Sequence, residues 1–169
     1  MTMKILLADD DQLMQQLYGH HIENAGFELV RAWDGLEALE LAAGKRPQVA
    51  VLDLQLPGLD GLSAVLELRK EKATKGIPVV VISSDPNSHL HKERVLAMGA
   101  AVLLTKPFGA TQLLGAIFGL LIEAARNAEL IEEPTDYVRT EDGRAAPESS
   151  PQEAHLAAQA LSNSGLVFA

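Results

Sequence analysis

The chain has 169 residues, of which 47% are hydrophobic and 22% charged, a formal net charge of −9 and no cysteine. This length suits one domain with an additional segment, and the composition excludes disulfides, thiolate metal sites and a basic nucleic-acid footprint. No apolar stretch approaches the roughly 20 residues that a membrane-spanning helix needs. The chain also enters its first strand at once, so we expect no signal peptide and a cytoplasmic location.

Five short apolar runs alternate with helical patterns over the first 127 residues. Between the runs, apolar residues recur three and four apart, as in the stripe of Met14, Leu17, Tyr18 and Ile22. The last helix is predicted at about 110–126. Alternating strands and helices with short connections predict a parallel sheet covered by helices on both faces. The predicted strands lie at about 4–8, 27–31, 49–53, 78–83 and 101–105.

Acidic residues and glycines predict where the helices begin and end. Asp11 and the pair Asp60-Gly61 each precede a helical pattern, where an aspartate can cap the first backbone amides. Gly26 and Gly44 are expected to end the first and second helices, because glycine readily adopts the left-handed conformation found at helix C-termini.

The composition and the hydrophobic periodicity of the sequence change at about residue 128. Residues 128–169 hold eight acidic residues against two arginines and lack hydrophobic periodicity. We therefore predict one domain over residues 1–127 and an acidic linker or tail over 128–169. Ser150 to Glu153 has the form of a capping box with proline at the first helical position, so a short helix at 151–163 is expected.

Charged side chains stand at the ends of three predicted strands. Asp9 and Asp10 follow the first strand, Asp53 ends the third and Lys106 follows the fifth. The carboxyl ends of parallel strands meet at one edge of a sheet, where open α/β folds carry their sites. Clustered carboxylates facing a lysine indicate a hard cation and an incoming phosphoryl group.

Four motifs carry a resemblance to a known family. They are Ile5–Asp11, Val51–Gly61, Pro78–Ser84 and Gly99–Phe108, and their order and spacing closely resemble bacterial two-component response-regulator receiver domains. The match covers roughly residues 3–127. The chain resembles the stand-alone, chemotaxis-regulator-like members of this family, with a C-terminal extension. The resemblance implies a flavodoxin-like doubly wound α/β fold with five parallel strands in the order 2-1-3-4-5 and five helices.

The resemblance also implies a phosphoacceptor and a magnesium site. Asp53 would be the carboxylate nucleophile that forms an acyl phosphate. Asp10 would bind Mg²⁺ directly and Asp9 through water, with Asp53 and the backbone carbonyl of Gln55 as further ligands. Magnesium prefers oxygen ligands and keeps several waters, so few protein ligands suffice.

The remaining implied site residues concern the phosphoryl group and the switch. Ser83 and Lys106 would contact the phosphoryl oxygens, and a cis peptide bond between Lys106 and Pro107 would aim the lysine inward. Ser83 and Leu103 occupy the switch positions. Receiver domains usually carry Tyr or Phe at the position of Leu103, so this chain lacks the aromatic ring that reports phosphorylation by turning inward.

The leading hypothesis is a phosphorylation-controlled signalling receiver. It would take its phosphoryl group from a sensor histidine kinase or a histidine phosphotransfer protein, and it would catalyse only its own phosphorylation and dephosphorylation. Output would pass through contacts with a downstream protein partner. We expect no nucleic-acid partner and no membrane partner, and the apolar last helix leaves a homodimer open.

Four alternatives remain open at this stage. A pseudo-receiver scaffold would recruit its partner without phosphate, which Leu103 favours and the otherwise intact set of site residues opposes. A phosphorelay shuttle would pass the phosphoryl group onward. The chain is also compatible with the N-terminal receiver of a larger multidomain regulator. The fourth alternative is an aspartate-nucleophile Mg²⁺ phosphatase. Those enzymes usually carry a second Asp two residues after the nucleophile, where this chain has Gln55.

Overall fold

The structure is a computed structural model that describes residues 1–88 and 92–131. The predicted acidic tail at 132–169, including the predicted helix at 151–163, lies outside the described residues. Strands and helices alternate along the described part of the chain, as predicted. They are β1 (Lys4–Ala8), α1 (Gln12–Asn24), β2 (Glu28–Ala32), α2 (Gly35–Lys45), β3 (Val49–Asp53), α3 (Gly61–Lys70), β4 (Val79–Ser83), α4 (Lys92–Ala97), β5 (Val102–Thr105) and α5 (Ala110–Ile131).

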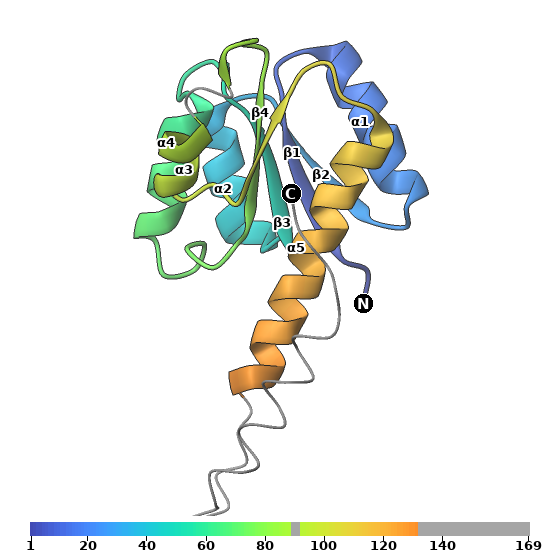
Figure 1. The fold of residues 1–169 in the computed structure, drawn as a ribbon, viewed down its shortest axis with the longest axis vertical. Helices are drawn as coiled ribbons and strands as arrows, with labels where there is room; N and C mark the ends of the chain where they lie inside the picture. Colours follow the sequence, from blue (N-terminus) through green and yellow to red (C-terminus); the bar gives the residue numbers. More distant parts are fainter. Residues whose placement is uncertain (89–91, 132–169) are drawn as a thin grey trace, which may run out of the picture. The chain divides into compact units, whose positions relative to one another are not determined.

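The five strands form one parallel sheet in the order β2-β1-β3-β4-β5 (Figure 1). This is the flavodoxin-like arrangement that the resemblance implied, and all five predicted strands are confirmed to within one residue at each end. The strand order reverses between β1 and β3, which pair directly from Ile5 with Val49 to Ala8 with Leu52. Open α/β sheets bind their ligands outside the carboxyl ends of the strands at such a switch point.

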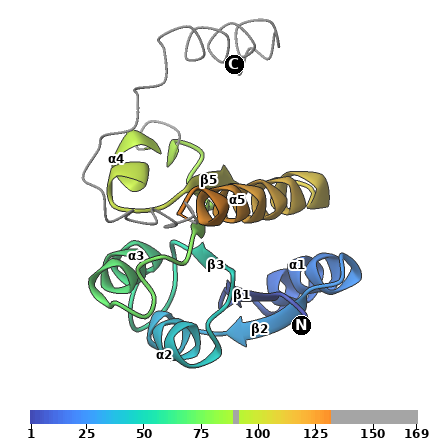
Figure 2. The same ribbon diagram turned by 90° about the horizontal axis from the view of Figure 1, so that it is seen from below.

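Two hydrophobic cores cover the two faces of the sheet. Helices α1 and α5 lie on one face, and α2, α3 and α4 lie on the other (Figure 2). Because side chains alternate along a strand, β3 sends Val49 and Val51 into the first core and Ala50 and Leu52 into the second. All four are fully buried, as expected for a central strand of a parallel sheet.

The helix ends agree with the sequence in all but two places, the C-termini of α2 and α5. Asp11 and Asp60 cap α1 and α3 as predicted, each accepting hydrogen bonds from two backbone amides. Gly26 follows α1 with φ of 90°. The prediction that Gly44 ends the second helix is wrong: α2 continues to Lys45, and Arg46 adopts the left-handed conformation at φ 50°. Pro47 follows directly, and a residue before proline disfavours the α-helical region.

Helix α5 is longer than predicted. It runs to Ile131 instead of about 126, and from Ile122 to Glu129 every residue is exposed. This segment is rich in alanine and contains no glycine or proline, so its helix propensity extends α5 past the end of the sheet (Figure 1). Even so, no helix in the described part of the chain is long and apolar enough to cross a membrane.

Candidate functional site

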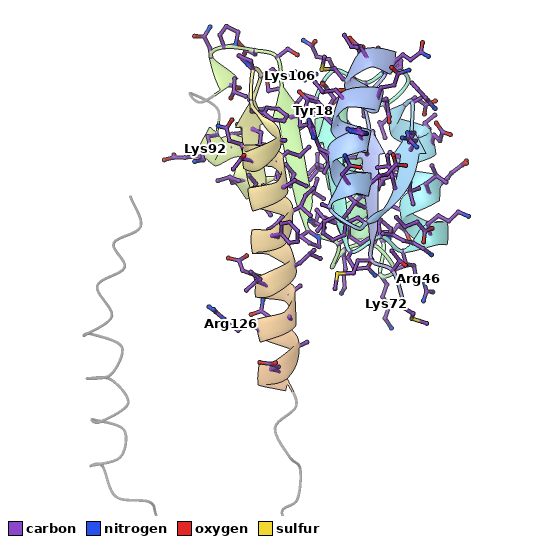
Figure 3. The ribbon with its side chains drawn as sticks, turned by 90° about the vertical axis from the view of Figure 1, so that its right-hand side faces the viewer. Tyr18, Arg46, Lys72, Lys92, Lys106 and Arg126 are labelled. Atoms are coloured by element: carbon purple, nitrogen blue, oxygen red, sulfur yellow. The ribbon has the colours of Figure 1, made fainter. Side chains whose placement is uncertain are left out.

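Three of the residues singled out in the sequence meet at the carboxyl edge of the sheet. The Nζ atom of Lys106 lies 2.6 Å from Oδ2 of Asp53 and 3.3 Å from Oδ2 of Asp9. Asp9 directly follows β1 and Asp53 is the last residue of β3, so the switch point of the sheet brings the two carboxylates together. Lys106 reaches them from the end of β5, near the upper end of the molecule in Figure 3.

Backbone amides fix the two carboxylates from the opposite side. Oδ1 of Asp9 accepts a hydrogen bond from the amide of Asp11 at 2.9 Å, and Oδ1 of Asp53 accepts one from the amide of Gln55 at 2.7 Å. In each carboxylate, Oδ1 therefore accepts a hydrogen bond from the backbone amide two residues later, and Oδ2 faces the Lys106 ammonium. Because both aspartates are at least 97% buried, these contacts replace the water that a carboxylate would otherwise bind.

The charges of the site act on one another. Burial raises the pKa of Asp9 above its usual value, and the charge of Asp53 raises it further, against the opposing hydrogen bond of Asp11 and the charge of Lys106. Burial alone would lower the pKa of Lys106, but its hydrogen bond with Asp53 and the charges of Asp53 and Asp9 outweigh that effect and raise it. The lysine therefore stays protonated at neutral pH beside the two carboxyl groups.

The other acidic candidate is not gathered into this cluster. Asp10 is exposed, and no three Asp, Glu, His or Cys side chains in the described residues lie together as a ready-made metal cage. Gln55 is exposed and contributes its amide to Asp53. The pair of Asp9 and Asp53, with Lys106 between them, is thus the ordered centre of the site.

The two residues to which the resemblance gave a switch role, Ser83 and Leu103, lie on adjacent strands. Ser83 ends β4 and is buried, and its Oγ accepts a hydrogen bond from the amide of Asp85 at 3.1 Å. Leu103 is half-buried and packs against the core beneath α2, α3 and α4. The peptide bond between Lys106 and Pro107 is cis, as the resemblance implied.

Sequence reasoning missed two contacts of helix α1. Its buried residues include Gln15 and Tyr18, whereas Leu17, which the predicted stripe included, is 46% exposed. The ring of Tyr18 stacks on that of Phe108, which follows Lys106 by two residues, with the ring centroids 4.9 Å apart. The available signal was the spacing of Gln15, Tyr18 and Ile22, which follows one helix face if a buried glutamine is allowed.

Comparisons with known proteins identify the family. The family model for the response regulator receiver domain matches residues 5–118. The transcriptional regulator RpaA of Synechocystis is 31% identical over 136 residues, which are 77% of this chain and 56% of RpaA. The response regulator DivK of Brucella ovis is 29% identical over 124 residues, which are 73% of this chain and all of DivK. The chain thus spans about half of the transcriptional regulator and the full length of the smaller relative.

Solved structures give the same result for the fold. The chemotaxis response regulator CheY4 of Vibrio cholerae superposes with a TM-score of 0.66 at 30% identity, over 72% of this chain and 100% of CheY4. The receiver domain of the sensor kinase PA1611 of Pseudomonas aeruginosa, which has magnesium in its active-site cleft, gives a TM-score of 0.65 at 25% identity, over 72% of this chain and 98% of that domain. This chain therefore belongs to the response regulator receiver domain family of two-component systems.

Proposed function

We propose that this chain is a phosphorylation-controlled signalling receiver in which Asp53 accepts a phosphoryl group from a histidine of a sensor kinase or phosphotransfer protein. The observation that carries the proposal is the buried Asp53 carboxylate, held at 2.6 Å by the Lys106 ammonium with Asp9 on the same ammonium. A buried nucleophile beside a fixed cation suits phosphoryl transfer, in which positioning and charge neutralisation do most of the catalytic work.

The phosphoryl group passes from a histidine nitrogen to an Asp53 oxygen in one displacement. A carboxylate oxygen of Asp53 attacks the phosphorus atom of a phosphohistidine, and a P–O bond forms as the P–N bond breaks. The imidazole nitrogen keeps the electron pair of that bond and takes up a proton. Lys106 turns its hydrogen bond from Asp53 toward a phosphoryl oxygen, and the Ser83 hydroxyl donates to another. The chain then catalyses only its own phosphorylation and dephosphorylation.

The donor set suits Mg²⁺. Two carboxylates converge on one ammonium, and magnesium is usually held by one or two carboxylates with several waters, so a cage of three acidic side chains is not required. We assign Asp9, Asp10, Asp53 and the Gln55 carbonyl as the ligand-bearing residues, as the family resemblance implies, and the similar PA1611 receiver holds magnesium in its active-site cleft. The ion would neutralise the excess negative charge and orient the phosphoryl oxygens.

The switch would pass through Ser83 and Leu103. When the Ser83 hydroxyl turns to a phosphoryl oxygen, it gives up the hydrogen bond from the Asp85 amide and moves the loop that follows β4. Leu103 lies on the neighbouring strand, paired with Val81, and repacks against that loop without an aromatic ring. The changed surface would then bind a downstream protein partner.

The test is an amide NMR titration with Mg²⁺ followed by beryllofluoride, which mimics a phosphoryl group on aspartate. We expect shifts at Asp53, Ser83 and Lys106 that are lost in Asp53→Asn. Asp34→Asn is the matched control, because Asp34 caps α2 and asparagine caps helices equally well. If the wild-type chain gives no Mg²⁺-dependent response, the phosphoacceptor proposal fails and a phosphate-independent scaffold is the better account.

A further inference from the structure

Gln15 is a buried amide without an obvious packing role. It lies on α1 with 1% of its surface exposed. Its Oε1 atom is buried and has no hydrogen-bond partner among the described residues. An unpaired buried acceptor lowers stability, whereas a methionine of similar length would fill the same space without that loss. Packing alone would therefore favour an apolar residue at this position.

The other end of the same amide explains why a glutamine is present. Nε2 of Gln15 lies 2.7 Å from the carbonyl oxygen of Ala32, 3.1 Å from that of Asp9 and 3.2 Å from that of Leu7. All three are acceptors, so only the nitrogen can face them, and the reversed amide would place Oε1 against three carbonyl oxygens. The orientation of the side chain is thereby fixed.

These contacts hold the peptide of Asp9 at both ends. Its amide nitrogen donates to the carbonyl of Ala32 at 3.3 Å, and its carbonyl oxygen accepts from Gln15. The ends of β1 and β2 are thus tied to α1 at the point where the chain leaves the sheet. The direction of the Asp9 side chain depends on this peptide, and its carboxylate is the one that shares Lys106 with Asp53.

We propose that Gln15 is a positioning residue that sets the Asp9 carboxylate for the cation of the site. The inference rests on the proposed phosphoacceptor function and adds a residue to it. Groups that orient a metal ligand from behind change metal affinity by about 10- to 100-fold when they are removed.

The test compares Gln15→Met with Gln16→Met in the full chain. Gln16 is the neighbouring glutamine and is exposed, so its variant matches the chemical change without touching Asp9. The readouts are the Mg²⁺ dissociation constant, from the fluorescence of the single tryptophan Trp33 or from the Asp9 amide resonance, and the melting temperature without Mg²⁺. We expect Gln15→Met to fold and to weaken Mg²⁺ binding about tenfold or more, and Gln16→Met to bind as the wild type does.

Two results would overturn the proposal. The first is a folded Gln15→Met variant with wild-type Mg²⁺ affinity, which would reduce Gln15 to a space-filling role. The second result applies if Gln15→Met does not fold. In the wild type, the side-chain amide resonances of Gln15 are then expected to shift when Mg²⁺ is added. If they stay constant while the Asp9 resonance shifts, the inference is contradicted. A wild-type chain that does not respond to Mg²⁺ at all would instead defeat the proposed function.

Discussion

Gly61 lies so close to the backbone of Asp53 that a β-carbon on Gly61 would stand 2.1 Å from the Asp53 carbonyl oxygen. The Gly61 amide also donates to the carbonyl of Leu54 at 3.0 Å. The first turn of α3 therefore rests directly on the end of β3. Because Gly61 has no side chain, the start of α3 can pack directly on the strand that ends at Asp53.

We accordingly expect Gly61→Ala to displace the end of β3 and to destabilise the fold by about 1–3 kcal/mol, the usual range for overpacking. It should also weaken the beryllofluoride response at Asp53. Gly44→Ala is the control, since its β-carbon would meet nothing within 4 Å and the helix around it favours alanine by about 0.5–1 kcal/mol. Urea unfolding of both variants decides: equal stabilities would contradict the close contact.

Lys106→Met removes the cation between two buried carboxylates. We expect the free energy of unfolding at pH 7 to fall by about 3 kcal/mol, as when one partner of a buried ion pair is deleted. Lys72→Met should change it little, because Lys72 is exposed. Chemical denaturation measures both values.

The effect of Lys106 should also depend on pH in one direction. Its pKa is raised in the folded state above 10.5, so its stabilising effect is complete below pH 10.5 and is lost as the pH rises through the folded value. The difference between the wild type and Lys106→Met should therefore be constant from neutral pH to about 10 and shrink at higher pH. A difference that grew in alkali would show that the Asp53 contact does not stabilise the ammonium.

The sequence predicted the part of the site that depends on strand geometry. Asp9, Asp53 and Lys106 follow apolar runs, and the parallel arrangement of those runs is sufficient to bring their ends to one edge. Roles taken from the family resemblance, such as those of Asp10 and Ser83, remain predictions, because they concern a bound ion and a phosphoryl group.

The features that the sequence analysis missed have two kinds of cause: tertiary contacts for Gln15, and local chain preferences for Arg46 and the end of α5. A glutamine is expected on the surface from sequence alone. Gln15 is buried because its side-chain amide donates to the carbonyl oxygens of Leu7 and Ala32. Gly44 was expected to end α2 because glycine favours the left-handed conformation. The helix ends instead just before Arg46, because Pro47 sterically disfavours the α-helical conformation of the residue before it. The length of α5 was underestimated for a related reason: a helix can continue without a core when its residues favour the helical state.

The stacked rings of Tyr18 and Phe108 hold the segment after Lys106 against α1. We expect a double-mutant cycle of Tyr18→Leu and Phe108→Leu to give a coupling energy of about 0.5–1.5 kcal/mol, as for other aromatic pairs.

A second aromatic pair provides the control for this prediction. The ring centroids of Phe27 and Phe118 lie 5.3 Å apart and tilted, with Phe27 buried and Phe118 44% exposed, and this pair should give a similar coupling energy. Only the Tyr18 and Phe108 variants should change the Lys106 response to beryllofluoride in NMR spectra. Equal responses in both pairs would show that the stack does not position the lysine.

Arg69 provides a stability test away from the site. Its guanidinium donates to the carbonyl oxygens of Gly99, Lys75 and Ile77 at 2.8–3.1 Å and joins the end of α3 to the turns before β4 and β5. Burial lowers its pKa from the usual value. Because hydrogen bonds to charged groups contribute about 1.5–3 kcal/mol, we expect Arg69→Met to lower the free energy of unfolding by about 3 kcal/mol or more.

Arg31→Met is the matched control. Arg31 pairs with Glu23 on the surface, so its loss should lower the free energy of unfolding by less than about 1 kcal/mol. Urea denaturation of the two variants measures the difference, and equal losses would contradict a clamping role for Arg69.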